Sequence, residues 1–398
     1  MKLAFLSLAV CCLAFAAAAQ GSAVLCGVDV LARDQGKQLH GRKVGLLTNH
    51  TGLAVDGRRT IDVIAALEAV KLVAIFSPEH GLSGKLDKDG IGHGTDEATR
   101  LPIWSLYGET RKPTKEMLSG IDTIVFDIQD IGCRFYTYVS TMGNCMEACA
   151  EHGLRFVVLD RPNPIDGATM AGPILDAGAE SFVGWHRMPL RHGMTAGELT
   201  RMFQGERGIR VEASVVACEG WSRKDRFDRT GLLWTDPSPN MRSLTQAMLY
   251  PGVGLLEGTN LSVGRGTDTP FERVGAPWCD GVALAAALRQ LGLPGVAIVP
   301  IRFTPNASKF ANELCSGVQI AITDWEAFEP VSLGVALACA LRDGFADPWK
   351  TEKLNWLWKH QASMDLFHQG ASAAEIQKSW QKDLDLFSMR RRPFLLYP

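Results

Sequence analysis

The chain lacks an excess of charge of either sign, because 41 lysines and arginines stand against 43 aspartates and glutamates in 398 residues. A formal net charge of −2 gives no electrostatic basis for binding nucleic acid or an anionic membrane surface. Long apolar runs are also missing. Beyond the N-terminal segment, no stretch approaches the roughly 18 consecutive apolar residues of a membrane-spanning helix. We therefore expect neither a nucleic-acid partner nor stable membrane insertion.

The apolar run at the N-terminus has the features of a secretory signal peptide. Lys2 supplies a positive charge, residues 3–15 are almost entirely apolar, and residues 17–19 are alanines of the kind that signal peptidase accepts. Residues 1–19 are therefore predicted to be a signal peptide, which would make the mature protein secreted or periplasmic.

Cysteines are few and scattered. Two of the ten lie in the predicted signal peptide, and the remaining eight include no Cys-x-x-Cys pair, which argues against structural zinc. An even number in an oxidising compartment permits one or two disulfides, with buried free thiols as the alternative. The eight are Cys26, Cys133, Cys145, Cys149, Cys218, Cys279, Cys315 and Cys339.

Several catalytic signatures are absent. There is no Walker loop, and the glycines of residues 252–258 have the wrong spacing for a dinucleotide fingerprint. Residues 260–264 come nearest to a Gly-x-Ser-x-Gly elbow but lack its first glycine. His80, His93 and His192 offer metal ligands, yet their spacing matches no metalloenzyme motif. We expect no cofactor and no bound metal.

Strand-like and helix-like segments alternate through the first half of the chain. Continuous apolar strands separated by helices indicate a parallel sheet covered on both faces, which is the doubly wound α/β class. The expected strands are residues 43–48, 72–76, 122–126 and 155–159, and the expected helices are residues 60–70 and 137–151.

The second half is less regular and predicts an auxiliary α+β domain. Thr195 is a plausible helix N-cap with Glu198 at the capping-box position, and residues 237–277 are expected to form a long loop that is either functional or disordered. We place the domain boundary near residue 175, giving domains of residues 22–175 and 176–398. Further strands are expected at residues 209–217, 296–301 and 318–322, and further helices at residues 195–204, 281–291, 331–342 and 371–384.

Polar clusters follow three successive strands of the predicted sheet. Residues 77–81 (Ser-Pro-Glu-His-Gly), 127–130 (Asp-Ile-Gln-Asp) and 160–164 (Asp-Arg-Pro-Asn-Pro) each come directly after a strand. Open α/β sheets bind ligands in the crevice outside the carboxyl ends of their strands. The three clusters are therefore expected to converge on one crevice.

Glu79 is the leading candidate for chemistry. Pro78 restricts the backbone before it, and Gly81 permits a tight turn after it. A carboxyl group at a strand end suits a general acid, with helix capping or an ion pair to a lysine as the structural alternative. His80 is compatible with either a structural or a functional role.

Two further segments carry candidate residues. Asp127 and Asp130 could supply a base, orient a water molecule or hold a sugar hydroxyl, with helix capping as the alternative. Arg134 could simply pair with Asp130, and the nearby tyrosines Tyr136 and Tyr138 offer stacking or a phenolic donor unless they only pack.

Arg265 lies between two glycines, so its planar guanidinium can meet an anion, although it could instead tether the loop to carbonyl groups. Glu257, Asp268 and Glu272 are further carboxylates within reach of a ligand.

These motifs together resemble the bacterial exo-β-N-acetylmuramidases of glycoside hydrolase family 171, formerly a domain of unknown function. The resemblance extends from residues 27–29 to residues 392–397 and rests on residues 77–81, 127–138, 160–164 and 257–267. It implies hydrolysis of β-1,4-linked N-acetylmuramic acid from the non-reducing end of peptidoglycan fragments. It also implies a Rossmann-like first domain, an auxiliary second domain and an active site in the cleft between them.

The resemblance also assigns roles to residues. Glu79 matches the family's catalytic glutamate, and the second catalytic role falls to Asp127, to Asp130 or to the substrate's own N-acetyl group. The lactyl carboxylate of muramic acid calls for an arginine, for which Arg265, Arg134 and Arg161 are the candidates. The expected substrate-binding residues are His80, Arg134, Tyr136, Tyr138, Arg161, Asn163, Asn260, Arg265 and Thr267.

Two other functions remain open at this point. A two-lobed periplasmic protein that binds sugars or muropeptides without catalysis would explain the export signal and the α/β pattern, but not the acids at the strand ends. The second is metal-dependent hydrolysis, which predicts that a chelator abolishes the activity.

Overall fold

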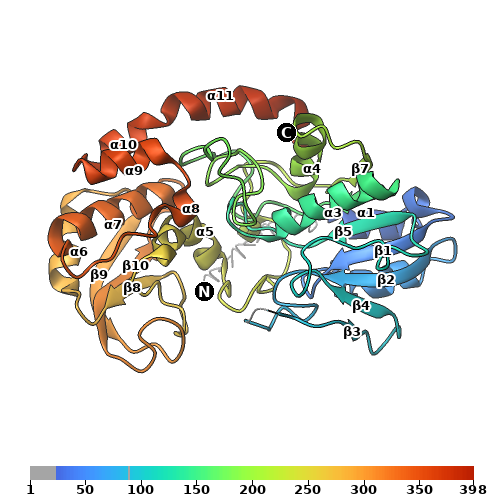
Figure 1. Ribbon diagram of the computed structural model, residues 1–398, viewed down its shortest axis with the longest axis horizontal. Coiled ribbons are helices and arrows are strands. Elements are labelled where there is room, and N and C mark those ends of the chain that lie inside the picture. Colours follow the sequence, from blue (N-terminus) through green and yellow to red (C-terminus); the bar gives the residue numbers. More distant parts are fainter. Residues whose placement is uncertain (1–23, 88–89) are drawn as a thin grey trace, which may run out of the picture.

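A seven-stranded sheet forms the first lobe of the computed structural model, which describes residues 24–87 and 90–398 (Figure 1). The strand order is β3-β4-β2-β1-β5-β6-β7, and among the strands described in this sheet β3 alone runs antiparallel to its neighbour. The strands are β1 (Lys43–Thr48), β2 (Lys71–Ser77), β3 (Gly94–Thr95), β4 (Pro102–Ser105), β5 (Thr123–Asp127), β6 (Arg155–Leu159) and β7 (Glu212–Val216).

The parallel strands have the order of the dinucleotide-binding doubly wound fold, with the switch point between β1 and β5. The predicted α/β class and Rossmann-like sheet are therefore confirmed. The four strands expected from apolar runs correspond to β1, β2, β5 and β6. The predicted signal peptide lies outside the described residues.

Both faces of this sheet are apolar, because successive side chains of a strand point to opposite sides. Leu46 and Ile75 pack in one core with helices α1 (Gly27–Arg33) and α2 (Thr60–Ala65). Their neighbours Leu47 and Phe76 pack in a second core with α3 (Tyr138–His152) and α4 (Ala196–Glu206). The uninterrupted apolar strands thus reflect burial on both faces.

Helix α4 begins where the capping pattern predicts. The Thr195 side chain accepts a hydrogen bond from the backbone of Glu198 (3.2 Å), and the Glu198 carboxylate accepts one from the backbone of Thr195 (3.1 Å). Glu198 is fully buried and also pairs with Arg223, so it fixes the surrounding loops as well as the helix start.

The sheet extends beyond the boundary expected near residue 175. Strand β7 pairs in parallel with β6 from Arg155↔Glu212 to Leu159↔Val216, and α4 is the helix that connects them. A parallel pair requires such a crossover, so the strand expected at residues 209–217 belongs to the first lobe.

A three-stranded antiparallel sheet forms the second lobe, in the order β8-β10-β9, as expected for an α+β unit. Helix α6 packs on β9 and β10, and α7 packs against α6 and α5. The elements of this half of the chain are α5 (Leu244–Val253), η3 (Gly254–Gly258), β8 (Arg273–Ala276), α6 (Gly281–Gln290), β9 (Val296–Phe303), β10 (Cys315–Ile322), α7 (Pro330–Phe345), α8 (Asn355–Trp358), α9 (Gln361–His368), α10 (Ala373–Ser379), α11 (Gln381–Arg391) and the 3-10 turn η4 (Arg392–Phe394). Two further 3-10 turns, η1 (Lys37–Leu39) and η2 (Phe227–Arg229), lie earlier in the chain.

Helix α5 is a correction to the expected long loop at residues 237–277. Its residues from Gln246 to Val253 are all buried, so no polar face gives the sequence a helical period. Pro251 inside the helix further disguises it.

Helix α11 crosses from the second lobe back to the first (Figure 1). Arg390 binds Glu206 at the end of α4 (2.7 Å), and Arg391 donates to the carbonyl oxygen of Gly193 (2.5 Å). The helix expected at residues 371–384 is in fact the pair α10 and α11, which meet at the buried Trp380. The C-terminal segment therefore fastens the lobes together.

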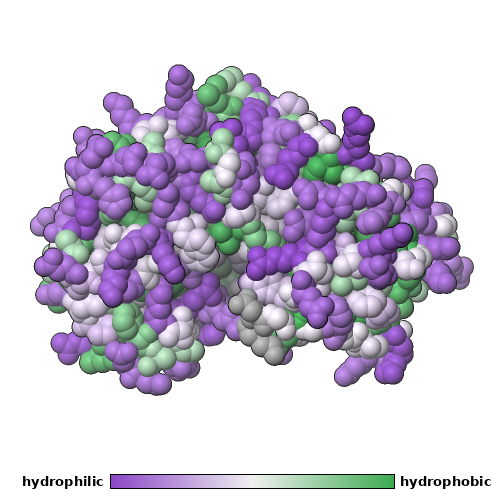
Figure 2. Space-filling view, viewed as in Figure 1, coloured by the Kyte–Doolittle hydropathy of each residue, from purple (hydrophilic) through white to green (hydrophobic). Residues whose placement is uncertain are grey.

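The surface and the cysteines complete the description. Figure 2 shows mainly hydrophilic side chains on one face, and no helix in the described residues is long and apolar enough to span a membrane. The eight cysteines that follow the predicted signal peptide are all buried free thiols, so the structure has none of the disulfides that the sequence permitted.

Candidate active site

A pocket of about 260 Å³ lies between the two lobes. The first lobe contributes Glu79, His80 and residues 135–138, and the second contributes residues from α5, from η3 and from the segment before β8. The second-lobe residues include Tyr250, Glu257, Arg265 and Phe271. The predicted cleft between the domains is therefore present.

The turn after β2 brings Glu79 to this pocket. The Gly81 amide donates to the carbonyl oxygen of Pro78 (3.0 Å), and the His80 ring is hydrogen-bonded to the carbonyl oxygen of Leu86 (2.8 Å). His80 and Gly81 both have left-handed backbone conformations, with φ of 69° and 72°. A glycine adopts this conformation without strain, which explains its place one residue after the histidine.

The Glu79 carboxylate is held from the loop before α3. The Thr137 hydroxyl donates a hydrogen bond to Glu79 Oε2. Thr137 is the N-cap residue of α3, and Tyr136 and Tyr138 on either side of it also line the pocket. The loop that follows β5 therefore reaches the site through residues 135–138 rather than through the acids directly at the strand end.

Aromatic rings form the floor of the pocket. The Tyr250 ring lies 4.9 Å from that of Phe135 and 4.7 Å from that of Phe271, measured between ring centroids. Tyr136 and Tyr138 meet edge to face at 4.9 Å. Burial raises the pKa of all three tyrosines, so each is a neutral phenol that can donate a hydrogen bond.

An arginine and a glutamate of the second lobe face this floor. Arg265 Nε donates to Glu257 Oε1, and the Arg265 guanidinium lies 5.1 Å from the centroid of the Phe271 ring. The Lys309 ammonium donates to the Glu257 carbonyl oxygen (2.5 Å). Both Nη atoms of Arg265 lack a hydrogen-bond partner in the described part of the chain, so its fork is open to an anion.

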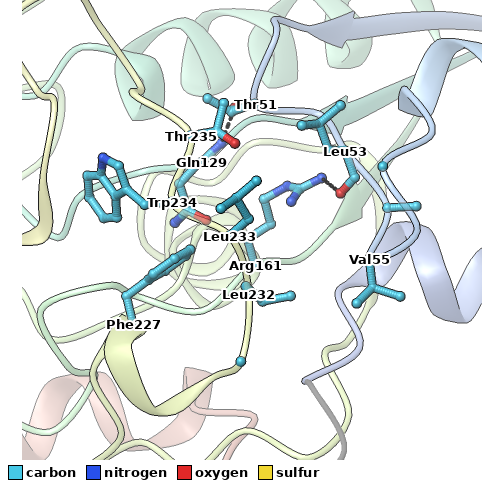
Figure 3. Close-up of a pocket in the computed structure, with 13 residues that line it drawn as sticks. Thr51, Leu53, Val55, Gln129, Arg161, Phe227, Leu232, Leu233, Trp234 and Thr235 are labelled. Atoms are coloured by element: carbon cyan, nitrogen blue, oxygen red, sulfur yellow. Dashed lines mark hydrogen bonds between the residues drawn. The ribbon is translucent and has the colours of Figure 1, made fainter.

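Asp127 and Arg161 lie elsewhere, at the switch point of the sheet. The Asp127 carboxylate is fully buried and accepts hydrogen bonds from Arg161 (2.5 and 3.0 Å) and from the Thr60 hydroxyl. Arg161 also donates to the carbonyl oxygen of Leu53 (2.9 Å). Figure 3 shows Arg161 in a separate pocket of about 200 Å³, beside Gln129 and Phe227.

This arrangement also bears on the absent dinucleotide motif. In the doubly wound fold a dinucleotide places its phosphates at the switch point. Here the Asp127 carboxylate occupies that region, where it is paired with the Arg161 guanidinium.

Three further predicted residues are buried in structural contacts outside the pocket. Arg134 donates to four backbone carbonyl oxygens at 2.7–3.1 Å, two of them in α8 of the second lobe, and burial lowers its pKa to about 10. Asp130 accepts from the Gly132 amide (2.7 Å), and Asn163 donates to the Met194 carbonyl oxygen (3.0 Å).

The last two predicted residues shape the loop that carries Arg265. Asn260 binds the backbone of Pro348 (2.8 Å) and of Lys350 (2.7 Å), and Thr267 donates to the Gly264 carbonyl oxygen (2.7 Å). The structure thus gathers Glu79, His80, Tyr136, Tyr138 and Arg265 in the pocket. It places Asp127, Asp130, Arg134, Arg161, Asn163, Asn260 and Thr267 outside it.

Sequence reasoning missed Thr137, Asp87, Asn240 and Tyr250 as pocket residues. A compositional signal could have found Tyr250. The chain has only five tyrosines, and three of them, Tyr136, Tyr138 and Tyr250, line this pocket.

The histidines considered as metal ligands lie apart. His93 Nδ1 accepts from the Ser105 amide (3.1 Å), His192 is buried near Asp130, and His80 borders the pocket. Within residues 24–87 and 90–398, no group of three or more histidines, cysteines or acids is arranged to hold a metal ion.

The fold and the pocket together define a two-lobed α/β protein. Its cleft is lined by the Glu79 carboxyl group and by the Arg265 guanidinium, whose Nη atoms have no partner among the described residues. The N-terminal profile of the exo-β-N-acetylmuramidase NamZ family matches residues 44–245, and its C-terminal profile matches residues 248–397. The chain belongs to this family. The two profiles meet between residues 245 and 248, well beyond the boundary expected near residue 175.

Individual relatives agree along nearly the whole chain. The peptidoglycan β-N-acetylmuramidase NamZ of Bacillus subtilis (strain 168) is 42% identical over 375 residues, which cover 93% of this chain and 91% of the relative. Two solved DUF1343 family proteins from Bacteroides fragilis NCTC 9343 have similar structures, with TM-scores of 0.88 and 0.78 and identities of 36% and 31%. Each comparison covers 94% of this chain and 99% of the solved one.

Proposed function

We propose that this protein is an exo-acting glycosidase that releases β-1,4-linked N-acetylmuramic acid from the non-reducing ends of peptidoglycan fragments. Family membership and the Bacillus subtilis relative support this activity. The observation that carries it is the pocket between the lobes, which is lined by Glu79 from the first lobe and by Arg265 from the second.

Glu79 is proposed to be the general acid. Glycoside hydrolysis requires a carboxylic acid that protonates the leaving oxygen as the glycosidic bond breaks. Glu79 is the family-matched glutamate, it lines the pocket, and the hydroxyl of Thr137 fixes the orientation of its carboxylate.

Arg265 is proposed to bind the lactyl carboxylate that distinguishes muramic acid from other amino sugars. Of the three candidate arginines, Arg134 is engaged by backbone carbonyl oxygens and Arg161 by Asp127. Arg265 lines the pocket with both Nη atoms open, and Glu257 holds its Nε side. A bidentate contact to a carboxylate suits this geometry.

The second catalytic group is to be sought inside the pocket. Asp127 and Asp130 do not line it, so a direct role for either would need a rearrangement of buried hydrogen bonds. Among the residues that the structure describes, the pocket carboxylates besides Glu79 are Asp87 and Glu257. The acetamido group of the substrate itself is the third candidate.

Incubation with a chromogenic β-N-acetylmuramide tests the activity. The wild-type protein should release the chromophore, and Glu79→Gln should lower kcat by about 10³-fold or more while the circular dichroism spectrum stays unchanged. Glu180→Gln, at an exposed position that does not line the pocket, is the matched control and should be fully active.

Each alternative function predicts a different result in the same assay. A pure binding protein would release no chromophore, and a metal-dependent hydrolase would lose activity when a chelator is added. Near-normal turnover by Glu79→Gln would remove Glu79 from the reaction.

We also propose that the protein is exported and acts in the periplasm or outside the cell. The signal-peptide pattern of residues 1–19 supports this, as does a substrate located in the cell wall. N-terminal sequencing of protein recovered from the producing cell should begin at Gln20. Recovery of only the full-length chain in the cytoplasm would contradict export.

A further inference from the structure

Tyr250 has an uncommitted phenol among the residues that line the pocket. Its side chain is 7% exposed, and its ring is held by Phe135, Tyr136 and Phe271, with centroid distances of 4.9, 6.1 and 4.7 Å. The Tyr250 hydroxyl makes no hydrogen bond to any residue that the structure describes. A pocket-lining phenol without a protein partner is free to exchange hydrogen bonds with a ligand.

The neighbours of Tyr250 place it between the two ends of the site. Toward the first lobe, Tyr136 is adjacent to Thr137, whose hydroxyl binds Glu79. Toward the second lobe, Phe271 lies between Tyr250 and the Arg265 guanidinium. Burial raises the pKa of Tyr250; the charges of Glu257 and Glu79 raise it further, and the charge of Arg265 lowers it, so groups from both ends of the site act on this hydroxyl.

The substrate has a matching order of groups. In N-acetylmuramic acid the glycosidic bond is on the anomeric carbon, the acetamido group is on the next carbon, and the lactyl ether is on the carbon after that. If Glu79 meets the glycosidic oxygen and Arg265 meets the lactyl carboxylate, the acetamido group lies between them. Tyr250 occupies the corresponding place in the pocket.

We propose that the Tyr250 hydroxyl donates a hydrogen bond to the carbonyl oxygen of the substrate's acetamido group. This inference rests on the proposed function and identifies the residue that recognises the acetamido group of the sugar, in addition to the lactyl carboxylate. The surrounding rings of Phe135 and Phe271 suit the acetamido methyl group, because they are apolar and rigidly packed. Tyr250 thereby fixes the acetamido oxygen beside the anomeric carbon.

A two-by-two comparison of enzyme and substrate tests the contact. Tyr250→Phe keeps the ring and removes only the hydroxyl, and an N-trifluoroacetyl glycoside keeps the shape of the substrate but weakens its carbonyl oxygen as an acceptor. We expect Tyr250→Phe to lower kcat/KM on the N-acetyl glycoside by about tenfold to a hundredfold. On the N-trifluoroacetyl glycoside the loss should be at least about threefold smaller.

Tyr397→Phe is the matched control, because its hydroxyl binds Asp160 and lies outside the pocket. Its kcat/KM values should equal those of the wild type on both glycosides.

Three results would overturn the proposal or its basis, and each is distinguishable. Unchanged kcat/KM in Tyr250→Phe would show that the hydroxyl has no part in the reaction. Equal losses on both glycosides would show that it contacts another part of the substrate. If the wild type turns over neither glycoside, the proposed glycosidase function fails, and the contact fails with it.

Discussion

The Thr137 hydroxyl donates a hydrogen bond to the Glu79 carboxylate, which joins the loop before α3 to the turn after β2. Thr137→Val keeps the shape of the side chain and removes this donor. We expect kcat to fall about tenfold, in line with the roughly 1–1.5 kcal/mol of a typical hydrogen bond.

Thr137→Ser is the matched control, because it retains the hydroxyl and should stay close to wild-type turnover. Steady-state kinetics on the chromogenic muramide measures both variants. Full activity in Thr137→Val would show that the hydrogen bond does not position Glu79 for the reaction.

The open fork of Arg265 predicts discrimination by the lactyl carboxylate. Arg265→Met should raise KM for the N-acetylmuramide by about tenfold to a hundredfold, because charge-assisted hydrogen bonds contribute roughly 1.5–3 kcal/mol. The β-N-acetylglucosaminide, which lacks the lactyl group, should bind no worse to the variant than to the wild type. An equal rise in KM for both glycosides would show that Arg265 maintains the shape of the pocket and does not bind the lactyl carboxylate.

The buried pair of Asp127 and Arg161 predicts a loss of stability without a direct loss of chemistry. Asp127→Asn leaves the Arg161 guanidinium without its counter-charge, and breaking such a pair costs about 3–5 kcal/mol. Urea unfolding should show this decrease in the free energy of unfolding. At low temperature, where the variant is folded, kcat should stay close to the wild-type value. A stable but inactive Asp127→Asn would return Asp127 to the catalytic candidates.

Asp160 predicts a pH dependence of stability. Burial raises its pKa from 3.8 to about 6, although Thr195, Tyr397 and the Gly197 amide donate hydrogen bonds that oppose the shift. Between pH 3.8 and about 6 the folded protein therefore binds more protons at Asp160 than the unfolded chain does. The contribution of this carboxyl to stability is present at low pH and is lost as the pH rises through that window.

The comparison with Asp160→Asn isolates this effect from the other acids. The free energy of unfolding of the wild type, minus that of the variant, should fall by on the order of 2–3 kcal/mol between about pH 4 and pH 6. Chemical denaturation at a series of pH values measures it. A difference that stays constant or rises over this range would contradict the raised pKa.

Local sequence patterns predicted much of the first lobe. Apolar runs located β1, β2, β5 and β6, because a strand buried on both faces needs an apolar residue at nearly every position. The capping box at Thr195 located the start of α4, since both of its hydrogen bonds form within four residues. The sequence did not predict helix α5, because the helix is buried on all sides and no polar face creates a helical pattern of apolar residues.

The convergence of three strand-end clusters was only partly right. The clusters after β5 and β6 do meet, as the pair of Asp127 and Arg161, but they meet each other at the switch point and not Glu79. Residues directly at a strand end bond to neighbouring loops, as Arg161 donates a hydrogen bond to the carbonyl oxygen of Leu53. The pocket instead uses residues 135–138, further along the chain, because these reach the second lobe.

The sequence by itself determined the sheet, the tight turn that carries Glu79 and, through its motifs, the family to which the chain belongs. These depend on short-range hydrogen bonds, backbone preferences and apolar spacing. Only the tertiary structure decided which arginine is free and which tyrosines line the pocket together with Glu79 and Arg265. A side chain is free to bind a ligand only if no carbonyl oxygen or carboxylate from a distant part of the chain already occupies its hydrogen-bonding groups. The packing of the two lobes determines those contacts.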